Sequence, residues 1–251
     1  MIIHQSHPEL SSGNKMKKTV SLKKAKRLKK SSQKWLLRQV NDPFVKKAKD
    51  AGYRSRAAFK LVEIDEKYKI LKKGKIVVDL GAAPGGWSQV AVAKVGAGNV
   101  VAIDLLEMDT IPGVRFIQQD FLTEDAPQKI IELLQEQTRR DRCDIVISDM
   151  AANTTGDASL DHLRIMTLLE DALVLSEKIL KEGGCFVGKL FQGGNSDQIV
   201  KLLRQNFGKV NYFKPDSSRK DSSEVYLVAL NFKDVNNPVV LVDKEPARRS
   251  S

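Results

Sequence analysis

Four charged residues, far apart along the chain, stand at expected helix and strand positions from which each can face one site. They are two lysines and two carboxylates: Lys60, Asp149, Lys189 and Glu224. Two amines and two carboxylates at one edge of a fold form a polar cluster of limited net charge. Such a cluster can exchange a proton or stabilise a developing negative charge. Each residue alone could equally be a solvated charge or a surface ion pair, so the elements that carry the four decide whether they meet.

The stretch Ile76–Trp87 predicts a buried strand that runs into a glycine-rich loop. Its first three residues are apolar and β-branched, Asp79 follows them, and the residues from Trp87 to Ala93 have the composition of a helix. A short, nearly all-apolar strand is typical of a parallel sheet that is covered on both faces. Strand, loop and helix together form the first unit of a doubly wound α/β fold, which binds its ligands at the carboxyl ends of the strands.

The loop departs from two common phosphate-binding patterns. Ala83 stands where a dinucleotide-binding loop needs its second glycine, and Trp87 replaces the lysine of a P-loop. Three glycines, Gly81, Gly85 and Gly86, would let a ligand approach the backbone closely. A loop with an aromatic residue and a carboxylate beside it suits a ligand that carries positive charge and no phosphate, so we predict that it binds S-adenosylmethionine. The alternative is a tight strand-to-helix turn that holds no ligand.

Two further carboxylates follow the next expected strands. The strand 99–103 ends at Asp104, and an acid at about this spacing lies over the ribose hydroxyls of a bound nucleoside. The alternative is an exposed aspartate at a strand end. The strand 114–117 leads to Asp120, which could accept a hydrogen bond from an adenine amino group.

The rest of the chain completes a pattern of seven strands with helices between them. The remaining strands are expected at 143–148, which ends at Asp149; at 185–188, which delivers Lys189; at 209–213; and at 224–230. The helices are expected on either side of Asp42-Pro43 and over 51–64, 126–138, 160–181 and 197–205, with Gly183-Gly184 capping the helix 160–181. We therefore predict a seven-stranded, mostly parallel sheet with helices on both faces. A basic loop at 214–220 could touch a phosphate backbone.

The 251-residue chain has a net charge of +11, and the excess lies near its start. Residues 11–40 hold eleven lysines and arginines and no acid, so the rest of the chain is formally neutral. Such a segment binds polyanions by releasing counterions, without reading their sequence; a solvated extension without a partner is the alternative. We expect a basic tail without fixed structure over 1–33, one folded domain over 34–233 and a loose end over 234–251.

Composition also narrows the class of protein. No segment approaches the roughly 18 apolar residues of a membrane span, and the first ten residues hold no stretch that resembles a signal peptide. The two cysteines, Cys143 and Cys185, fall in expected strands, and the three histidines form no ligand cluster. We therefore expect a monomeric cytoplasmic protein that has neither a disulfide framework nor a metal site.

Five motifs carry a resemblance to a known family. In chain order they are Ser55–Leu61, Asp79–Trp87, Ser148–Ala151, Gly188–Gly193 and Ser222–Tyr226. Over roughly residues 41–232 the chain resembles the FtsJ/RrmJ family of ribose 2′-O-methyltransferases, and most of all the members that methylate a uridine of 23S ribosomal RNA. The resemblance implies a Rossmann-like, S-adenosylmethionine-dependent methyltransferase fold, ribosomal RNA as the partner, and a role in maturation of the large ribosomal subunit.

The resemblance also implies a role for each candidate residue. The family's catalytic Lys-Asp-Lys-Glu set is matched by Lys60, Asp149, Lys189 and Glu224. Its S-adenosylmethionine contacts are matched by Gly85, Trp87, Asp104, Asp120 and Asp149, and Gly81 belongs to the same loop. The ribose 2′-hydroxyl would attack the methyl carbon, and Lys189 would either accept the hydroxyl proton or stabilise the forming oxyanion. A charged Lys60 would disfavour the charged form of Lys189, whereas the two carboxylates would favour it, so the sequence leaves both roles open.

Two other functions fit the same residues. A tRNA ribose 2′-O-methyltransferase would share the motifs at the methyl site and would differ only in its RNA contacts. A non-catalytic RNA-binding or ribosome-assembly factor would keep the fold and the basic tail. Such a factor gains little from a complete set of four polar residues, which argues against it.

Overall fold

The computed structural model describes residues 41–151, 158–191, 196–219 and 222–233. The chain divides into two compact units, Met1–Lys46 and Lys47–Ser251, and the sheet and the candidate site belong to the second. The helix α2 (Pro43–Asp50) is the one expected after Asp42, with proline at its first position. The basic tail, the helix expected before Asp42 and the C-terminal end lie outside the described residues.

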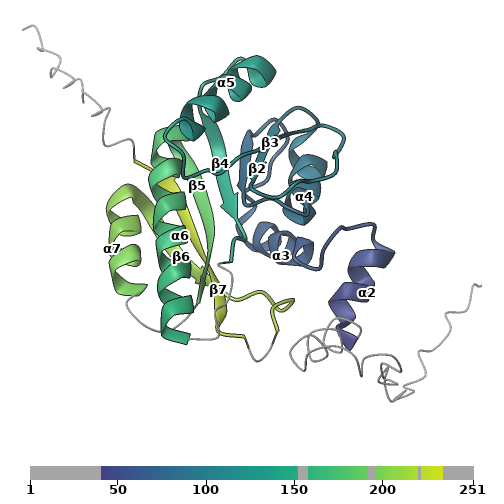
Figure 1. Cartoon of the computed structure of the whole chain (residues 1–251). Helices are drawn as coiled ribbons and strands as arrows, with labels where there is room; N and C mark the ends of the chain where they lie inside the picture. The colour runs from purple at the N-terminus through teal and green to yellow at the C-terminus, as the bar shows by residue number, and fades with distance from the viewer. Residues whose placement is uncertain (1–40, 152–157, 192–195, 220–221, 234–251) are drawn as a thin grey trace, which may run out of the picture. The chain divides into compact units, whose positions relative to one another are not determined.

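The second unit is built around one sheet of seven strands in the order β3-β2-β1-β4-β5-β7-β6 (Figure 1). In chain order the strands are β1 Val77–Leu80, β2 Val100–Asp104, β3 Val114–Gln118, β4 Cys143–Ser148, β5 Leu180–Phe191, β6 Phe207–Phe213 and β7 Glu224–Phe232. Neighbouring strands pair in parallel, except that β7 is antiparallel to both β5 and β6. The chain order of the strands reverses at β1 and β4, and an open α/β sheet binds its ligand at such a switch point.

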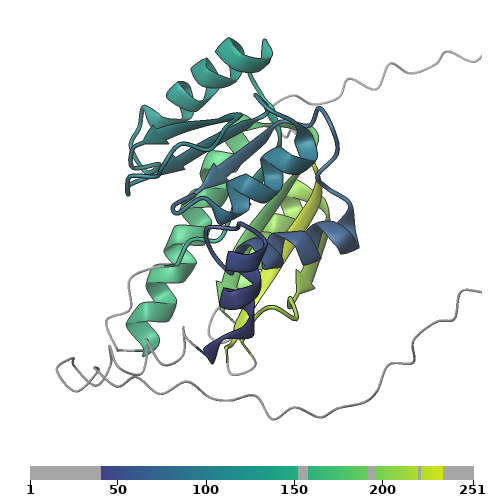
Figure 2. The same ribbon diagram turned by 90° about the vertical axis from the view of Figure 1, so that its right-hand side faces the viewer.

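Helices cover both faces of this sheet, as predicted (Figures 1 and 2). The helices α3 (Ala58–Tyr68) and α4 (Gly86–Val95) cover one face, and α5 (Ala126–Thr138), α6 (Ala158–Ile179) and α7 (Ser196–Asn206) cover the other. Successive strand residues point to opposite faces, so Val77 packs with α3 and α4 whereas Val78 packs with α5, α6 and α7. The sheet is therefore buried on both sides, and its strand ends are left to form a site.

The helix that carries Lys60 begins later than predicted. The expected helix 51–64 is wrong at its start, because α3 begins at Ala58. Gly52 adopts a positive φ of 73°, and the Tyr53 N–H bonds back to the Ala48 carbonyl at 2.8 Å, which closes the preceding helix. Residues 53–57 are therefore a connecting turn, and their side chains are free to reach neighbouring loops.

The end of α6 also differs from the prediction. The expected glycine cap after residue 181 is wrong, because α6 ends at Ile179 and Leu180 already pairs with Cys143 of β4. The register then shifts, and pairing resumes between Cys185 and Ile145, so that the glycines lie in a strand irregularity. The strand β5 runs on to Phe191, which places Lys189 inside the strand, opposite Tyr226, rather than at its end.

Candidate active site

The two lysines and two carboxylates meet at the carboxyl-end edge of β4 and β5. Lys60 comes from α3, Asp149 directly follows β4, Lys189 lies in β5, and Glu224 begins β7. The Nζ of Lys60 is 2.8 Å from Oε1 of Glu224 and 3.6 Å from Oδ1 of Asp149. The Nζ of Lys189 is 3.1 Å from the same Asp149 oxygen. The four side chains therefore form one connected cluster, which we call the tetrad.

Burial separates the tetrad from ordinary surface ion pairs. Lys60, Lys189 and Glu224 are only 9%, 7% and 8% exposed. Charged side chains are rarely this buried unless they are paired, because an uncompensated charge in the interior is costly. Two positive and two negative groups balance one another here. The solvated-charge alternative is therefore excluded for these residues.

Asp149 is the hub of the tetrad. Besides contacting both lysines, its Oδ1 accepts a hydrogen bond from the Tyr226 hydroxyl at 2.5 Å, and its backbone carbonyl accepts one from Lys189 at 2.5 Å. Burial alone would raise the pKa of Asp149, but the Lys189 and Lys60 ammoniums and the Tyr226 hydroxyl outweigh it and hold the pKa below its ordinary value. Asp149 is therefore a fixed negative charge between the two lysines.

Glu224 is tied to the loop that follows β6. The Ser218 hydroxyl donates to Oε1 of Glu224 at 2.8 Å, and the neighbouring Ser217 N–H donates to Glu63 of α3 at 3.0 Å. Arg56 donates to the Ser217 carbonyl as well. The basic loop is thus fastened beside the tetrad, and its contact with a phosphate backbone stays a prediction.

Asp79, at the carboxyl end of β1, is the most perturbed carboxyl at this edge. Burial, and after it the negative charges of Asp149 and Asp104, raise its pKa to about 7, against the Ser88 hydroxyl that donates to it at 2.6 Å. A cationic ligand beside these acids would favour the ionised form of Asp79. This electrostatic environment fits a sulfonium-bearing cofactor and opposes a phosphate.

The glycines of the loop make room for protein atoms. A Cβ on Gly81 (φ +70°) would collide with the side chain of Met150, and one on Gly85 (φ +104°) would lie 2.6 Å from Cδ1 of Ile111. Both therefore need glycine on grounds of conformation and packing alone. Their predicted contact with the cofactor stays a prediction, made through backbone atoms.

Arg54 fastens this loop to the next one. Its guanidinium donates to the carbonyl of Pro84 at 3.2 Å, of Asp109 at 2.7 Å and of Thr110 at 2.8 Å. The backbone N–H of Arg54 donates to the Gln89 side chain of α4 at 2.8 Å. One side chain therefore holds the loops after β1 and β2 at a fixed separation.

Trp87 supports the site from within the core. Its indole ring is buried, its Nε1–H donates to the Ala57 carbonyl at 2.8 Å, and the ring packs on Tyr226 with centroids 5.6 Å apart. The ring therefore supports Tyr226 and the turn before α3. A cofactor contact by this residue, which stays a prediction, would use its backbone N–H in the first turn of α4.

Asp104 and Asp120 lie at the carboxyl ends of β2 and β3, as predicted. Asp104 ends β2 and accepts hydrogen bonds from the N–H groups of Ala83 and Leu106, both at 2.8 Å. Asp120 follows β3 and accepts one from the Leu122 N–H at 2.9 Å. Asp104 thus orients the glycine loop directly, and the nucleoside contacts of both acids stay predictions.

Several site residues were missed by sequence reasoning. Tyr226 lies in a motif that we singled out, but it reads as one apolar position of a buried strand. Ser218 and Arg54 act through contacts between loops distant in the chain, which leave no local signal. Asp79 belongs to the motif around the glycine loop. Its position in an apolar strand, just before the glycine turn, was the available clue to its raised pKa.

Two absences concern only the residues that the structure describes. Within those ranges no group of three or more His, Cys, Asp or Glu side chains is placed to hold a metal ion. Within the same ranges no helix has the length and apolar character needed to cross a membrane.

The model of the FtsJ-like methyltransferase family matches residues 53–232. Proteins named ribosomal RNA large subunit methyltransferase E are similar to this chain: the one from Azorhizobium caulinodans is 51% identical over 85% of this chain and 89% of its own, and one from Rhodopseudomonas palustris is 54% identical over 85% and 91%.

Solved structures agree with this assignment. A structure from Plasmodium falciparum described as a ribosomal RNA methyltransferase has a TM-score of 0.63 and 34% identity, covering 72% of this chain and 98% of that one. A hemolysin from Streptococcus thermophilus (TM-score 0.52, 17% identity) covers 72% of this chain and 68% of its own, and shares the fold alone. On the family match and the identity of these relatives, the chain belongs to the FtsJ-like methyltransferase family.

Proposed function

We propose that this protein transfers the methyl group of S-adenosylmethionine to the 2′-hydroxyl of a uridine ribose in 23S ribosomal RNA, during maturation of the large ribosomal subunit. The observation that carries the proposal is the buried tetrad at the switch-point edge of the sheet, around Asp149. The names and high identity of the bacterial relatives support ribosomal RNA as the substrate. A cytoplasmic location and a monomeric state remain predictions.

The residues at the carboxyl ends of β1, β2 and β3 fit the proposed cofactor. S-adenosylmethionine, when bound, supplies an electrophilic methyl group on a sulfonium. Asp79 and Asp149 would face that cation, and Asp104, which ends β2, would contact the ribose hydroxyls. Backbone atoms of Gly81, Gly85 and Trp87, together with the Asp120 carboxylate, would complete the contacts.

Within the tetrad we assign Lys189 to the reacting oxygen of the substrate. A lysine ammonium has three N–H donors, and Lys189 uses two of them on the carboxylate and the carbonyl of Asp149. The third is available for the 2′-oxygen as that oxygen bonds to the methyl carbon and the methyl–sulfur bond breaks, with the hydroxyl proton passing to solvent water. Lys60 and Glu224 form the adjoining ion pair, which steers the ribose and keeps the cluster balanced.

The assay that tests this proposal measures transfer of labelled methyl from S-adenosylmethionine to three RNA substrates. These are large ribosomal subunits, free 23S rRNA and tRNA, all prepared from cells that lack the enzyme. We expect labelling of the ribosomal RNA at a ribose 2′-oxygen, located by nucleoside analysis. Labelling of tRNA alone would establish the tRNA alternative, and binding of RNA without any transfer would establish the non-catalytic one.

A further inference from the structure

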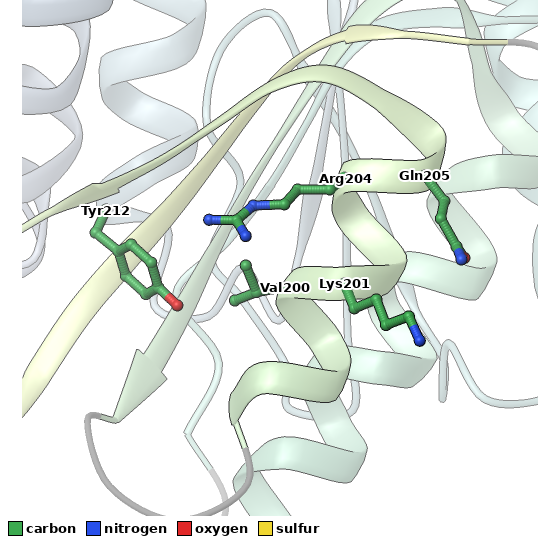
Figure 3. Close-up of a pocket in the computed structure, with 5 residues that line it drawn as sticks. All are labelled: Val200, Lys201, Arg204, Gln205 and Tyr212. Carbon is green, nitrogen blue, oxygen red and sulfur yellow. The ribbon is translucent and has the colours of Figure 1, made fainter.

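A hollow of about 410 Å³ lies between α7 and β6, away from the tetrad (Figure 3). It is lined by Val200, Lys201, Arg204, Gln205 and Tyr212. Val200 packs into the core on the face covered by α5, α6 and α7, whereas the helix of Lys60 packs on the opposite face. The hollow is therefore separate from the site described above, and no step of the proposed reaction uses it.

An exposed aromatic ring forms one wall of the hollow. Tyr212 is 46% exposed, which is high for a large ring, and it lies on β6, the edge strand of the sheet. The Arg204 side chain extends from α7 toward this ring, with Val200 at the base between them, while Lys201 and Gln205 point to the other side of the helix (Figure 3). Among the described residues, no acid forms an ion pair with Arg204 or Lys201.

The pair of Tyr212 and Arg204 matches a nucleotide in chemistry. A nucleobase stacks on an exposed aromatic ring, and the planar guanidinium of arginine stacks on the base from the other side. A free phosphate or an acidic peptide would use the guanidinium but would gain nothing from the tyrosine ring. A single-stranded RNA segment uses the ring and the guanidinium together.

The register of the sheet relates the hollow to the tetrad. Tyr212 pairs with Leu227 of β7, and Leu227 pairs with Gly188 of β5, the residue before Lys189. Two strand spacings, about 10 Å in all, therefore separate the backbone of Tyr212 from that of Gly188. The loop that joins β6 to β7 starts two residues after Tyr212 and is bonded to Glu224 through Ser218. An RNA strand with its ribose at Lys189 can thus pass over the edge strand into the hollow.

We infer that the hollow between α7 and β6 is a second RNA contact, in which a base of the substrate strand, a few nucleotides from the methylated ribose, stacks between Tyr212 and Arg204. The inference rests on the proposed function, because it assigns to that function a further binding site. The site would hold single-stranded RNA and would take no part in cofactor binding or in chemistry.

The experiment uses the full-length protein and a fluorescein-labelled decauridylate, with a second decauridylate that carries one 5-iodouridine for photocrosslinking. Crosslinked peptides are mapped by mass spectrometry, and we expect Tyr212 among them. Tyr212→Ala should weaken binding about 5-fold or more, as expected for one lost stacking contact, and Tyr212→Phe should restore it. Arg204→Gln should weaken binding to a similar extent, because it removes the guanidinium plane on the other side of the base.

Lys73→Gln is the matched control, because it removes an exposed cation from the loop before β1, a strand four places away from β6 in the sheet. The inference is overturned if Tyr212→Ala and Arg204→Gln bind decauridylate as Lys73→Gln does and no crosslink maps to β6. Methyl transfer to ribosomal subunits, followed in parallel, distinguishes the two proposals. If the wild type transfers methyl groups and the variants bind decauridylate normally, only this inference is overturned. If the wild type transfers no methyl group but Tyr212→Ala still weakens decauridylate binding, only the proposed reaction is overturned.

Discussion

The hydroxyl of Tyr226 donates a hydrogen bond to Oδ1 of Asp149 at 2.5 Å, from a strand position that is completely buried. Burial raises the pKa of Tyr226 well above its ordinary value, and the negative charges of Asp149 and Glu224 raise it further, so the hydroxyl keeps its proton and remains a donor. Tyr226 therefore fixes the carboxylate that in turn holds both lysines. It is a positioning residue, because it acts through Asp149.

Tyr226→Phe removes this donor and leaves the ring in place. We expect kcat to fall about 10-fold, the loss of one hydrogen bond to a charged group, with little change in the affinity for S-adenosylmethionine. Steady-state kinetics and calorimetric titration separate the two quantities. Tyr68→Phe, which removes a hydroxyl at the far end of α3, is the control and should keep full activity. An unchanged kcat in Tyr226→Phe would show that Asp149 needs no support from the tyrosine.

Lys189→Ala should nearly abolish methyl transfer while leaving cofactor affinity little changed, because the side chain contacts Asp149 and the substrate oxygen in our assignment. Lys181→Ala, which removes a lysine paired with Asp144 at the other end of the same strand, is the control. Single-turnover rates of the wild type across about pH 6 to 9 then test the role of the lysine. A flat profile, with chemistry limiting, fits an oxyanion donor, and a rise that reports one group losing its proton fits a base. A large loss of cofactor binding in Lys189→Ala would contradict both.

Asp79 makes the stability of the cofactor-free protein depend on pH. Burial raises its pKa to about 7, from an ordinary value of 3.8, so the folded state keeps a proton that the unfolded chain releases. The resulting stability is complete below about pH 4 and is lost as the pH rises to about 7. The Asp79→Asn variant has no ionisable group at this position. Its free energy of unfolding should therefore rise relative to that of the wild type as the pH increases over this interval, by up to about 4 kcal/mol. Urea unfolding at a series of pH values measures the difference.

The control for this series is Asp141→Asn, which changes an exposed acid in the loop before β4. Its difference from the wild type should not grow over the same interval. If the difference in free energy of unfolding between Asp79→Asn and the wild type is the same at about pH 4 as at about pH 8, Asp79 does not titrate as described.

Arg54 should influence cofactor affinity without touching the cofactor. Arg54→Gln loses the fork that joins the carbonyls of Pro84, Asp109 and Thr110, so the two loops are no longer held at one separation. We expect the dissociation constant for S-adenosylmethionine to rise about 10-fold, roughly 1.4 kcal/mol, with partial recovery in Arg54→Lys. Arg115→Gln, an exposed arginine on β3, serves as the control. Equal cofactor affinity in Arg54→Gln and Arg115→Gln would refute the clamp.

Deleting residues 1–33 should weaken RNA binding mainly at low salt. This segment carries most of the basic excess of the chain, and each phosphate contact that it makes contributes to the salt dependence of the affinity. The slope of log affinity against log salt should therefore become shallower, while cofactor affinity stays the same. An unchanged slope would mean that the tail makes no phosphate contact.

The parts of the fold that follow hydrophobic pattern could be predicted from the sequence. Largely apolar runs such as Val77–Leu80 and Cys143–Ser148 identify buried parallel strands. Parallel strands bring their carboxyl ends to one edge of the sheet, so the sequence could predict that the four tetrad residues meet there. The irregularity before Cys185 could not, because Gly183-Gly184 gives the same local signal as a helix cap. The choice depended on whether Leu180 pairs with Cys143, which is a contact between residues far apart in the chain.

The same reason limits what could be predicted within the site. Lys189 and Asp149 follow apolar strand residues, and such charged residues are conspicuous in a sequence. Tyr226 belongs to an apolar alternation, and only its neighbours in space reveal that its hydroxyl has a charged partner. Likewise the Ser218 and Arg54 contacts depend on how loops are placed after the sheet has formed.

The strand β7 is the last described strand in the chain, yet it lies inside the sheet between β5 and β6 and carries both Glu224 and Tyr226. A nascent polypeptide that has not yet emerged as far as Glu224 therefore lacks one member of the tetrad, the tyrosine that supports Asp149, and the strand that β5 and β6 share. Methyl transfer should begin only after β7 has been synthesised and has paired with β5.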